Sequence, residues 1–152
     1  MKTILIALDY NPTAIKVAES GFAMAKAMGA EVTLLHVLVN PLMYSTAYAN
    51  MGAWQIDTLD ANDTMEIIKT GSRNFLKKAK RHLGDETIQI IQKEGDFADT
   101  ILNTAKEINA ECIVLGSHSQ KWLENIVMGS VTEEVLRKTS IPLFIVPTKK
   151  ME

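Results

Sequence analysis

Short apolar runs alternate along the chain with longer segments in which apolar residues recur every three or four positions. Five runs are too short for helices and rich in branched side chains, and they cover residues 4–8, 32–37, 87–92, 112–115 and 142–147. Runs of this kind predict strands that are buried on both faces of a sheet.

Two segments in the first half of the chain carry helix signals. The first helix is expected to begin at Asn11, as an N-cap followed by Pro12 in the first helical position, and to end at Gly29. The second covers residues 61–83. Its expected apolar face consists of Met65, Ile68, Phe75, Leu76, Ala79 and Leu83.

Two further helices follow in the second half. Asp96 is expected to cap a helix that has Asp99 at its third position, and another helix is expected to start near Ser130. Helices therefore separate all five strands. Strands joined in this way pair in parallel through right-handed crossovers, which predicts a single α/β domain whose parallel sheet has helices on both faces.

The segment from Leu38 to Asp60 does not fit this pattern of short connections between strands and helices. It is far longer than the roughly 2–6 residues usual between a strand and the next helix, and it holds Tyr44, Tyr48 and Trp54. One interpretation is a mobile excursion that folds back on the surface. The other is a lid or a partner-contact segment.

Composition excludes several classes of protein. The 152 residues include 16 basic and 18 acidic side chains, for a net charge of −2, and nothing in the sequence resembles the basic stripe that a binder of the phosphate backbone needs. The lone Cys112 excludes an internal disulfide. No apolar run reaches the roughly 18 residues of a membrane span, and the N-terminus does not resemble a signal peptide. We therefore expect a cytoplasmic protein.

Candidate ligand-binding residues occur in the loops after the first and fourth strands. If these two strands are neighbours, Asp9 and Gly116 flank the crevice where an open parallel sheet binds ligands. Gly129 and Ser130 then start a helix whose unpaired N–H groups suit a phosphate. The alternative is structural, because Ser130 and Glu133 have the spacing of a capping box that needs no ligand.

Four stretches resemble the universal stress protein family: the opening ILIALD, LLHV in the second strand, GDFADTI at 95–101, and GSHSQKWLENIVMGSVTEEVLRKTSIPLFIVP from Gly116 onward. The resemblance implies a single-domain, flavodoxin-like, Rossmann-related (HUP-type) fold with an open five-stranded parallel sheet in the order 3-2-1-4-5. It also implies one domain over 1–148, a short tail at 149–152, and a homodimer formed through the strand from Pro142 to Val146.

The nucleotide-binding branch of that family has the pattern Gly-x-x-Gly, nine residues, then Gly-Ser or Gly-Thr. Matched position by position, the implied nucleotide-binding residues are Asp9, Val37, Gly116, His118, Ser119, Gly129, Ser130 and Val131. Asp9 corresponds to the aspartate near the ribose, and Val37 to the residue whose backbone meets the adenine. Ser119 departs from the pattern, since it stands where the second glycine is expected.

The resemblance implies ATP as the ligand, accompanied by Mg²⁺ on its phosphates, in a stress-response or signalling module. Two alternatives remain: a stress dimer that binds an unknown protein partner without nucleotide, and a slow or partner-dependent ATP hydrolase. The chain contains no Walker A motif, and no residue is assigned a catalytic role.

Overall fold

The computed structural model describes residues 1–38, 61–117 and 129–148. Within these residues nine elements follow one another: β1 (Thr3–Leu8), α1 (Ala14–Met28), β2 (Glu31–Leu38), α3 (Ala61–Leu83), β3 (Gln89–Glu94), α4 (Phe97–Glu107), β4 (Cys112–Gly116), α5 (Ser130–Lys138) and β5 (Leu143–Val146). The expected alternation of strands and helices is confirmed.

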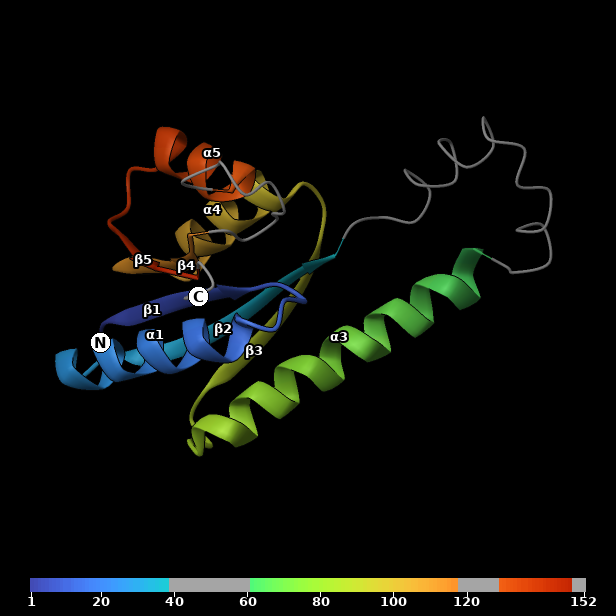
Figure 1. The fold of residues 1–152 in the computed structure, drawn as a ribbon, viewed down its shortest axis with the longest axis horizontal. Coiled ribbons are helices and arrows are strands. Elements are labelled where there is room, and N and C mark those ends of the chain that lie inside the picture. Colours follow the sequence, from blue (N-terminus) through green and yellow to red (C-terminus); the bar gives the residue numbers. More distant parts are fainter. Residues whose placement is uncertain (39–60, 118–128, 149–152) are drawn as a thin grey trace.

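All five strands are parallel and lie in the order β3-β2-β1-β4-β5, which confirms the predicted fold and strand order. Helices α1 and α3 cover one face of the sheet, and α4 and α5 cover the other (Figure 1). Since side chains alternate along a strand, each inner strand feeds both layers. In β1, Ile4 and Ile6 pack under α1, while Leu5 packs against α4 and α5.

The start of α1 differs from the sequence prediction. The helix begins at Ala14 rather than at Pro12, with Thr13 as its N-cap. Asn11 caps the preceding turn instead, because its Oδ1 accepts hydrogen bonds from the backbone N–H of Thr13 at 3.0 Å and from its hydroxyl at 2.9 Å. The predicted end is confirmed, with Gly29 in the left-handed conformation at φ 67°.

The two helices on the other face begin differently from each other. Asp96 caps α4 as predicted, and its carboxylate accepts the N–H of Asp99 at 3.1 Å. The capping box expected at Ser130 is wrong. Gly129 is the N-cap of α5, so Ser130 already lies in the first turn and no side chain caps this helix.

The start of β3 also differs from the sequence prediction, and two predicted segments fall outside the described residues. β3 begins at Gln89 rather than at residue 87, because the N–H and hydroxyl of Thr87 both bond to Asp85 in a turn. The long segment predicted from Leu38 to Asp60 lies outside the described residues, except for Leu38, which ends β2. The tail predicted at 149–152 also lies outside them.

Candidate functional site

The carboxyl ends of β1 and β4 lie side by side at the centre of the sheet. β1 pairs with β2 on one side and with β4 on the other, so the strand order reverses here. In open α/β sheets this is the point at which neighbouring connections diverge and leave a crevice for a ligand. The condition set by the sequence, that the fourth strand pairs beside the first, is therefore met.

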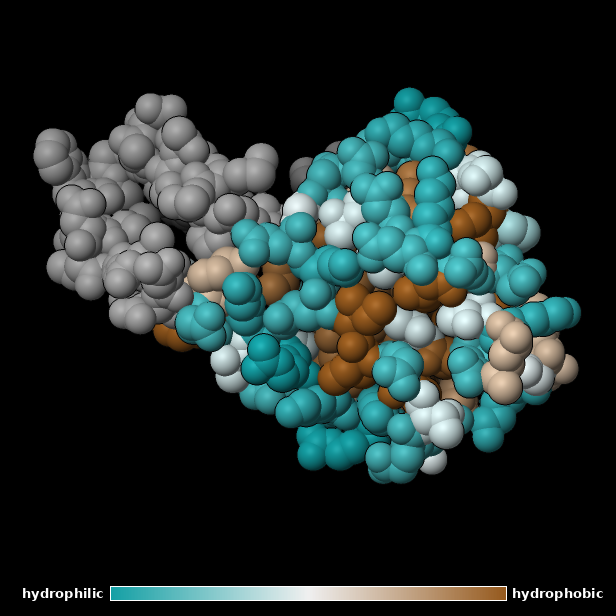
Figure 2. All heavy atoms as spheres, turned by 180° about the vertical axis from the view of Figure 1, so that it is seen from behind, coloured by the Kyte–Doolittle hydropathy of each residue, from teal (hydrophilic) through white to brown (hydrophobic). Residues whose placement is uncertain are grey.

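A small, largely apolar hollow opens at this edge on the α4 and α5 face. Three of the predicted residues line it from three different elements: Asp9 after β1, Val37 in β2 and Val131 in α5. Phe97 and Ile101 of α4 complete its wall, and sequence reasoning had not assigned them to the site. Apolar side chains also reach the surface between polar ones on the side of the molecule that Figure 1 hides (Figure 2).

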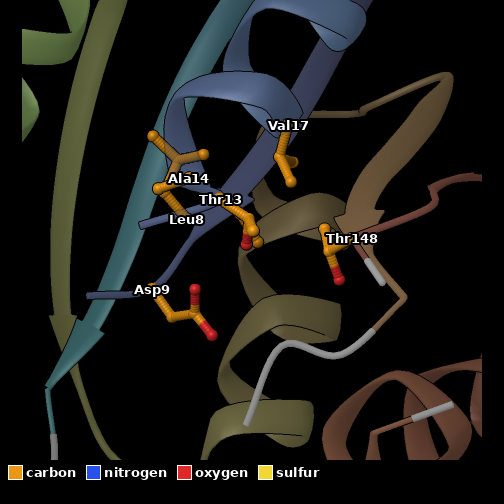
Figure 3. A pocket seen from close by; sticks show the side chains of 8 residues that line it. Leu8, Asp9, Thr13, Ala14, Val17 and Thr148 are labelled. Atoms are coloured by element: carbon orange, nitrogen blue, oxygen red, sulfur yellow. The ribbon is translucent and has the colours of Figure 1, made fainter. Parts of the chain in front are cut away.

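A second hollow lies on the α1 side of the same edge. Asp9 and Gly116 line it together with Thr13 and Thr148 (Figure 3). Asp9 therefore borders both hollows, and two predicted site residues meet here. The two threonines were not predicted as part of the site; Thr148 follows β5, a strand that the sequence linked only to dimerisation.

The environment of Asp9 disfavours its charge. Burial raises the pKa of the Asp9 carboxyl from 3.8 to about 6, and a hydrogen bond from its own backbone opposes the shift only in part. A carboxyl poised in this way at a ligand crevice is typical of functional sites.

The flanks of the 118–128 segment are tied together. Gly129 donates its N–H to the carbonyl of Ser117 at 2.7 Å, and Ser117 donates to Val146 at 2.9 Å. The hydroxyl of Thr132 reaches the carbonyl of Gly116 at 2.8 Å. The start of α5 is thereby held against the end of β4, which brings Gly129 and Ser130 to the same edge as Gly116. The predicted residues His118 and Ser119 lie outside the described residues.

Gly116 is required by packing, independently of any ligand. A Cβ at this position would lie 2.9 Å from Cγ2 of Thr148 and 3.1 Å from Cγ2 of Val17. We expect Gly116→Ala to lower the free energy of unfolding by about 1–3 kcal/mol, the usual cost of overpacking. Denaturant unfolding should show the loss, and Val17→Ala in the same chain should restore part of it. An unchanged stability in Gly116→Ala would contradict the packing account.

A buried histidine lies one residue before Val37 and points to the other face of the sheet. The Nδ1 atom of His36 and the hydroxyl of Ser72 share a hydrogen bond at 2.6 Å. Burial lowers the pKa of His36 to about 4, so the ring is neutral near pH 7. The Tyr10 ring packs edge-on against the His36 ring, with 4.6 Å between the ring centroids. The centroid of the Phe75 ring, on α3, lies 4.8 Å from that of Tyr10.

This cluster, made of Tyr10, His36, Ser72 and Phe75, connects α3 to the two strands that carry Asp9 and Val37. The sequence placed Phe75 on the apolar face of its helix but gave no role to Ser72. The only signal was the pair Gly71-Ser72 in the middle of an otherwise regular helix. A Cβ on Gly71 would lie 3.3 Å from the Tyr10 hydroxyl, which accounts for the small residue there.

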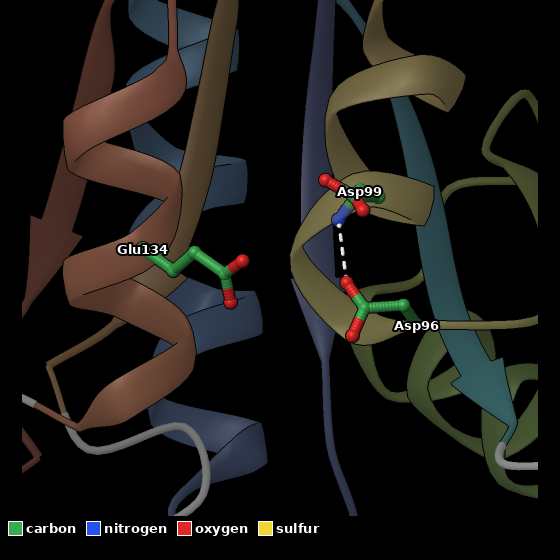
Figure 4. A group of neighbouring side chains, drawn as sticks. All are labelled: Asp96, Asp99 and Glu134. Carbon is green, nitrogen blue, oxygen red and sulfur yellow. Dashed lines mark hydrogen bonds between the residues drawn. The ribbon is translucent and has the colours of Figure 1, made fainter.

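Three carboxylates gather between α4 and α5, on residues that do not line the two hollows. They belong to Asp96, Asp99 and Glu134 (Figure 4). Lys138 already supplies a cation: its Nζ lies 3.2 Å from Asp99 and 2.8 Å from Glu134. The group therefore joins the two helices through an ion-pair network, and we assign no metal to it.

Two negative findings concern the described residues alone. None of their helices is long and apolar enough to cross a membrane. Cys112 is buried in β4, and burial raises the pKa of its thiol, so it behaves as a small apolar side chain.

Comparison with known proteins decides the family. The model of the universal stress protein family matches residues 1–147. The chain belongs to the universal stress protein family. The resemblance noted in the sequence is thus confirmed. Universal stress protein MJ0531 of Methanocaldococcus jannaschii is 29% identical over 154 residues, a match that covers 99% of this chain and 85% of that protein.

Solved structures of similar proteins agree with this fold. The hypothetical protein MJ0577 superposes with a TM-score of 0.77 at 26% identity, covering 99% of this universal stress protein and 98% of the other chain. A universal stress protein from Archaeoglobus fulgidus, solved in complex with dAMP, superposes with a TM-score of 0.60 at 21% identity, covering 95% and 97% of the two chains. At that identity the second likeness concerns the fold alone.

Proposed function

We propose that this universal stress protein binds ATP at the carboxyl edge of β1 and β4. The observation that carries the proposal is the convergence of Asp9, Val37 and Val131, from three elements, on one hollow at the point where the strand order reverses. The apolar wall suits a flat aromatic base. A relative of the same fold was solved with dAMP, which shares the adenine ring with ATP.

Two ends of the ligand require different partners. The Asp9 carboxylate is the acceptor for ribose hydroxyl groups. The phosphates lie at the first turn of α5, where Gly129 provides no capping side chain and Ser130 is exposed. The N–H groups of such a turn, with the partial positive charge of the helix, attract an anion. Mg²⁺ is then held mainly by phosphate oxygens and water, since Asp9 is the one carboxylate among the residues that line the two described hollows.

Nucleotide binding rather than hydrolysis is the proposed activity. Hydrolysis needs a group that orients water and others that stabilise the developing charge. The described lining residues supply Asp9 and two threonine hydroxyls but neither lysine nor arginine. A signalling function fits these lining residues, in which bound nucleotide changes the dimer contact or the contact with a protein partner.

Ligand release tests the proposal directly. Protein purified without nucleotide removal is denatured, and the released small molecules are identified by mass spectrometry. We expect adenine nucleotide, and we expect calorimetry on the stripped protein to show ATP binding. Absence of nucleotide together with no heat on ATP addition would favour the stress dimer that acts without nucleotide. Steady phosphate release would favour the hydrolase.

We also propose that β5 forms a homodimer. Within the described chain β5 pairs on one side only, with β4, and Phe144 is exposed on it. A free apolar edge is an aggregation hazard that pairing with a second copy removes, and Pro142 and Pro147 limit the length of such pairing.

Sedimentation equilibrium at micromolar concentration should therefore report a dimer. Phe144→Lys is expected to weaken it at least about tenfold, because it places a charge in an apolar interface. Ile67→Lys makes the same kind of change at another exposed apolar side chain, on α3, and should leave the dimer intact. A stable wild-type monomer would contradict the dimer.

A further inference from the structure

Helix α3 carries a charge opposite to that of the rest of the chain. It contains six basic residues and two acidic ones, which leaves ten basic and sixteen acidic residues elsewhere. All six basic residues lie between position 69 and the end of the helix: Lys69, Arg73, Lys77, Lys78, Lys80 and Arg81. A net charge of −2 for the whole chain thus hides a local positive surface.

Four of these side chains form a stripe along one flank of α3. At about 100° per residue, Lys69, Arg73, Lys77 and Lys80 fall within an arc of about 80°, and the stripe is about 17 Å long. The arc that holds Ser72, Leu76 and Ala79 is the buried one. The stripe therefore borders the buried face, on a helix that forms the outer layer of its side of the sheet (Figure 1).

Within the described part of the chain, no side chain of the stripe is ion-paired with a carboxylate, although Lys80 interacts with the Asp85 carboxylate at longer range. Of the seven other lysines and arginines among the described residues, two form ion pairs: Lys93 with Glu107, and Lys138 with Glu134 and Asp99. His82 at the end of α3 pairs with Glu19. None of the six lysines and arginines of α3 has a described carboxylate oxygen within the 4.0 Å of an ion pair.

Helix stability does not account for the stripe. Like charges four residues apart, such as Lys69, Arg73 and Lys77, repel each other and destabilise a helix by a few tenths of a kcal/mol per pair. The helix dipole favours cations only in the last turn. It therefore explains Lys80 and Arg81 but not Lys69, Arg73 or Lys77.

We propose that this stripe, defined by Lys69, Arg73, Lys77 and Lys80, docks an acidic helical segment of a partner protein. Glutamates four residues apart on a helix are about 6 Å apart along its axis, the same spacing as Lys69, Arg73 and Lys77. Each cation can then face one carboxylate when the two helices lie nearly parallel or antiparallel. Charge complementarity of this kind sets orientation and partner choice.

Two other anionic partners fit less well. A membrane-surface helix needs an apolar face turned to the lipid, and the apolar face of α3 is buried against the sheet. A nucleic acid is attracted by many phosphate contacts, whereas this stripe is short and the rest of the chain, with sixteen acidic against ten basic residues, repels a long polyanion.

The location gives the contact a route to the proposed nucleotide site. Ser72 and Phe75, on the same helix, contact His36 and Tyr10, which directly adjoin Val37 and Asp9 in the chain. Binding to the stripe itself does not depend on nucleotide, so it can be tested without it.

The test uses two synthetic peptides of about 20 residues with the same composition, one with glutamates at every fourth position and one with them scattered around the helix. Fluorescence anisotropy measures their binding to the wild type and to two triple variants. The first variant carries Lys69→Gln, Arg73→Gln and Lys77→Gln. The second, a control with the same change in charge, carries Lys2→Gln, Lys106→Gln and Arg137→Gln, all at exposed positions. Circular dichroism confirms that both remain folded.

We expect the wild type to bind the patterned peptide more tightly than the scattered one. The stripe variant should lose about tenfold in affinity and the control variant less than about twofold. Binding should weaken as salt is raised from about 50 mM to about 500 mM. Equal losses in the two variants would overturn the proposal. So would stripe-dependent binding that is tighter to a uridine oligonucleotide, or to vesicles containing phosphatidylserine, than to the patterned peptide.

Discussion

Replacing Gly129 with Asp is expected to abolish ATP binding while the protein stays folded. Gly129 is the N-cap of α5 with φ −67° and ψ 157°, an extended conformation that Asp adopts without strain. Aspartate is a favoured N-cap, and its carboxylate would accept the N–H groups of the first turn. Those N–H groups are the ones proposed to meet the phosphates, so an internal anion would replace the external one. We expect at least about a hundredfold loss of affinity, about 2.7 kcal/mol.

Two controls separate charge from shape. Gly129→Ala adds bulk without an acceptor and should lose much less affinity than the Asp variant. Ser140→Asp adds the same charge before β5, at the opposite edge of the sheet, and should bind ATP as the wild type does. Calorimetry gives the affinities, and thermal unfolding verifies the fold. Equal ATP affinity in the wild type and in Gly129→Asp would contradict the proposed phosphate site.

Asp9→Asn should make the protein more stable and a poorer ATP binder. The pKa of Asp9 in the folded protein, about 6, lies above its ordinary 3.8, so the folded state holds the proton more tightly than the unfolded chain does. The stability that this proton confers is fully present below about pH 4 and is lost as the pH rises through about 6. At pH 7 the ionised, buried carboxylate costs about 1–3 kcal/mol, which a neutral amide avoids.

Denaturant unfolding between about pH 4 and pH 8 tests the first half of this prediction. The wild type should lose stability relative to Asp9→Asn as the pH rises, and the two should converge in acid. ATP titration tests the second half: wild-type affinity should fall below about pH 6, where Asp9 takes up a proton, and the variant should bind weakly at every pH. A variant that is less stable than the wild type at pH 8 would contradict the burial of an unfavourable charge. Full ATP affinity in the variant would contradict the ribose contact.

A stabilising change that removes binding distinguishes a functional residue from a structural one. Gly116→Ala should show the reverse pattern in stability, because that glycine is needed for packing between β4, α1 and Thr148. Residues at the same sheet edge are therefore needed for different physical reasons: Asp9 for the ligand and Gly116 for packing.

Local patterns were sufficient for most of the architecture. Buried parallel strands are apolar on both faces, so β1, β2 and β4 stand out as continuous runs. Helix α3 was predicted from about Ala61 to Leu83, which agrees with its observed bounds, because its apolar period is regular and Gly84 ends it. The ends of α1 and β3 were less well predicted, since Asn11 and Thr87 belong to turns whose side-chain bonds also satisfy nearby N–H groups.

The sequence by itself determined the family, the order of elements and some of the residues that reach the carboxyl edge, such as Asp9 and Val37, because these depend on hydrophobic period and on motif spacing. Only the tertiary structure decided how those residues behave there. It made Gly129 rather than Ser130 the cap of α5, paired His36 with Ser72 across 36 positions, and buried Asp9 between two hollows. Burial and the proximity of remote segments set these pKa values and contacts, and no local pattern encodes them.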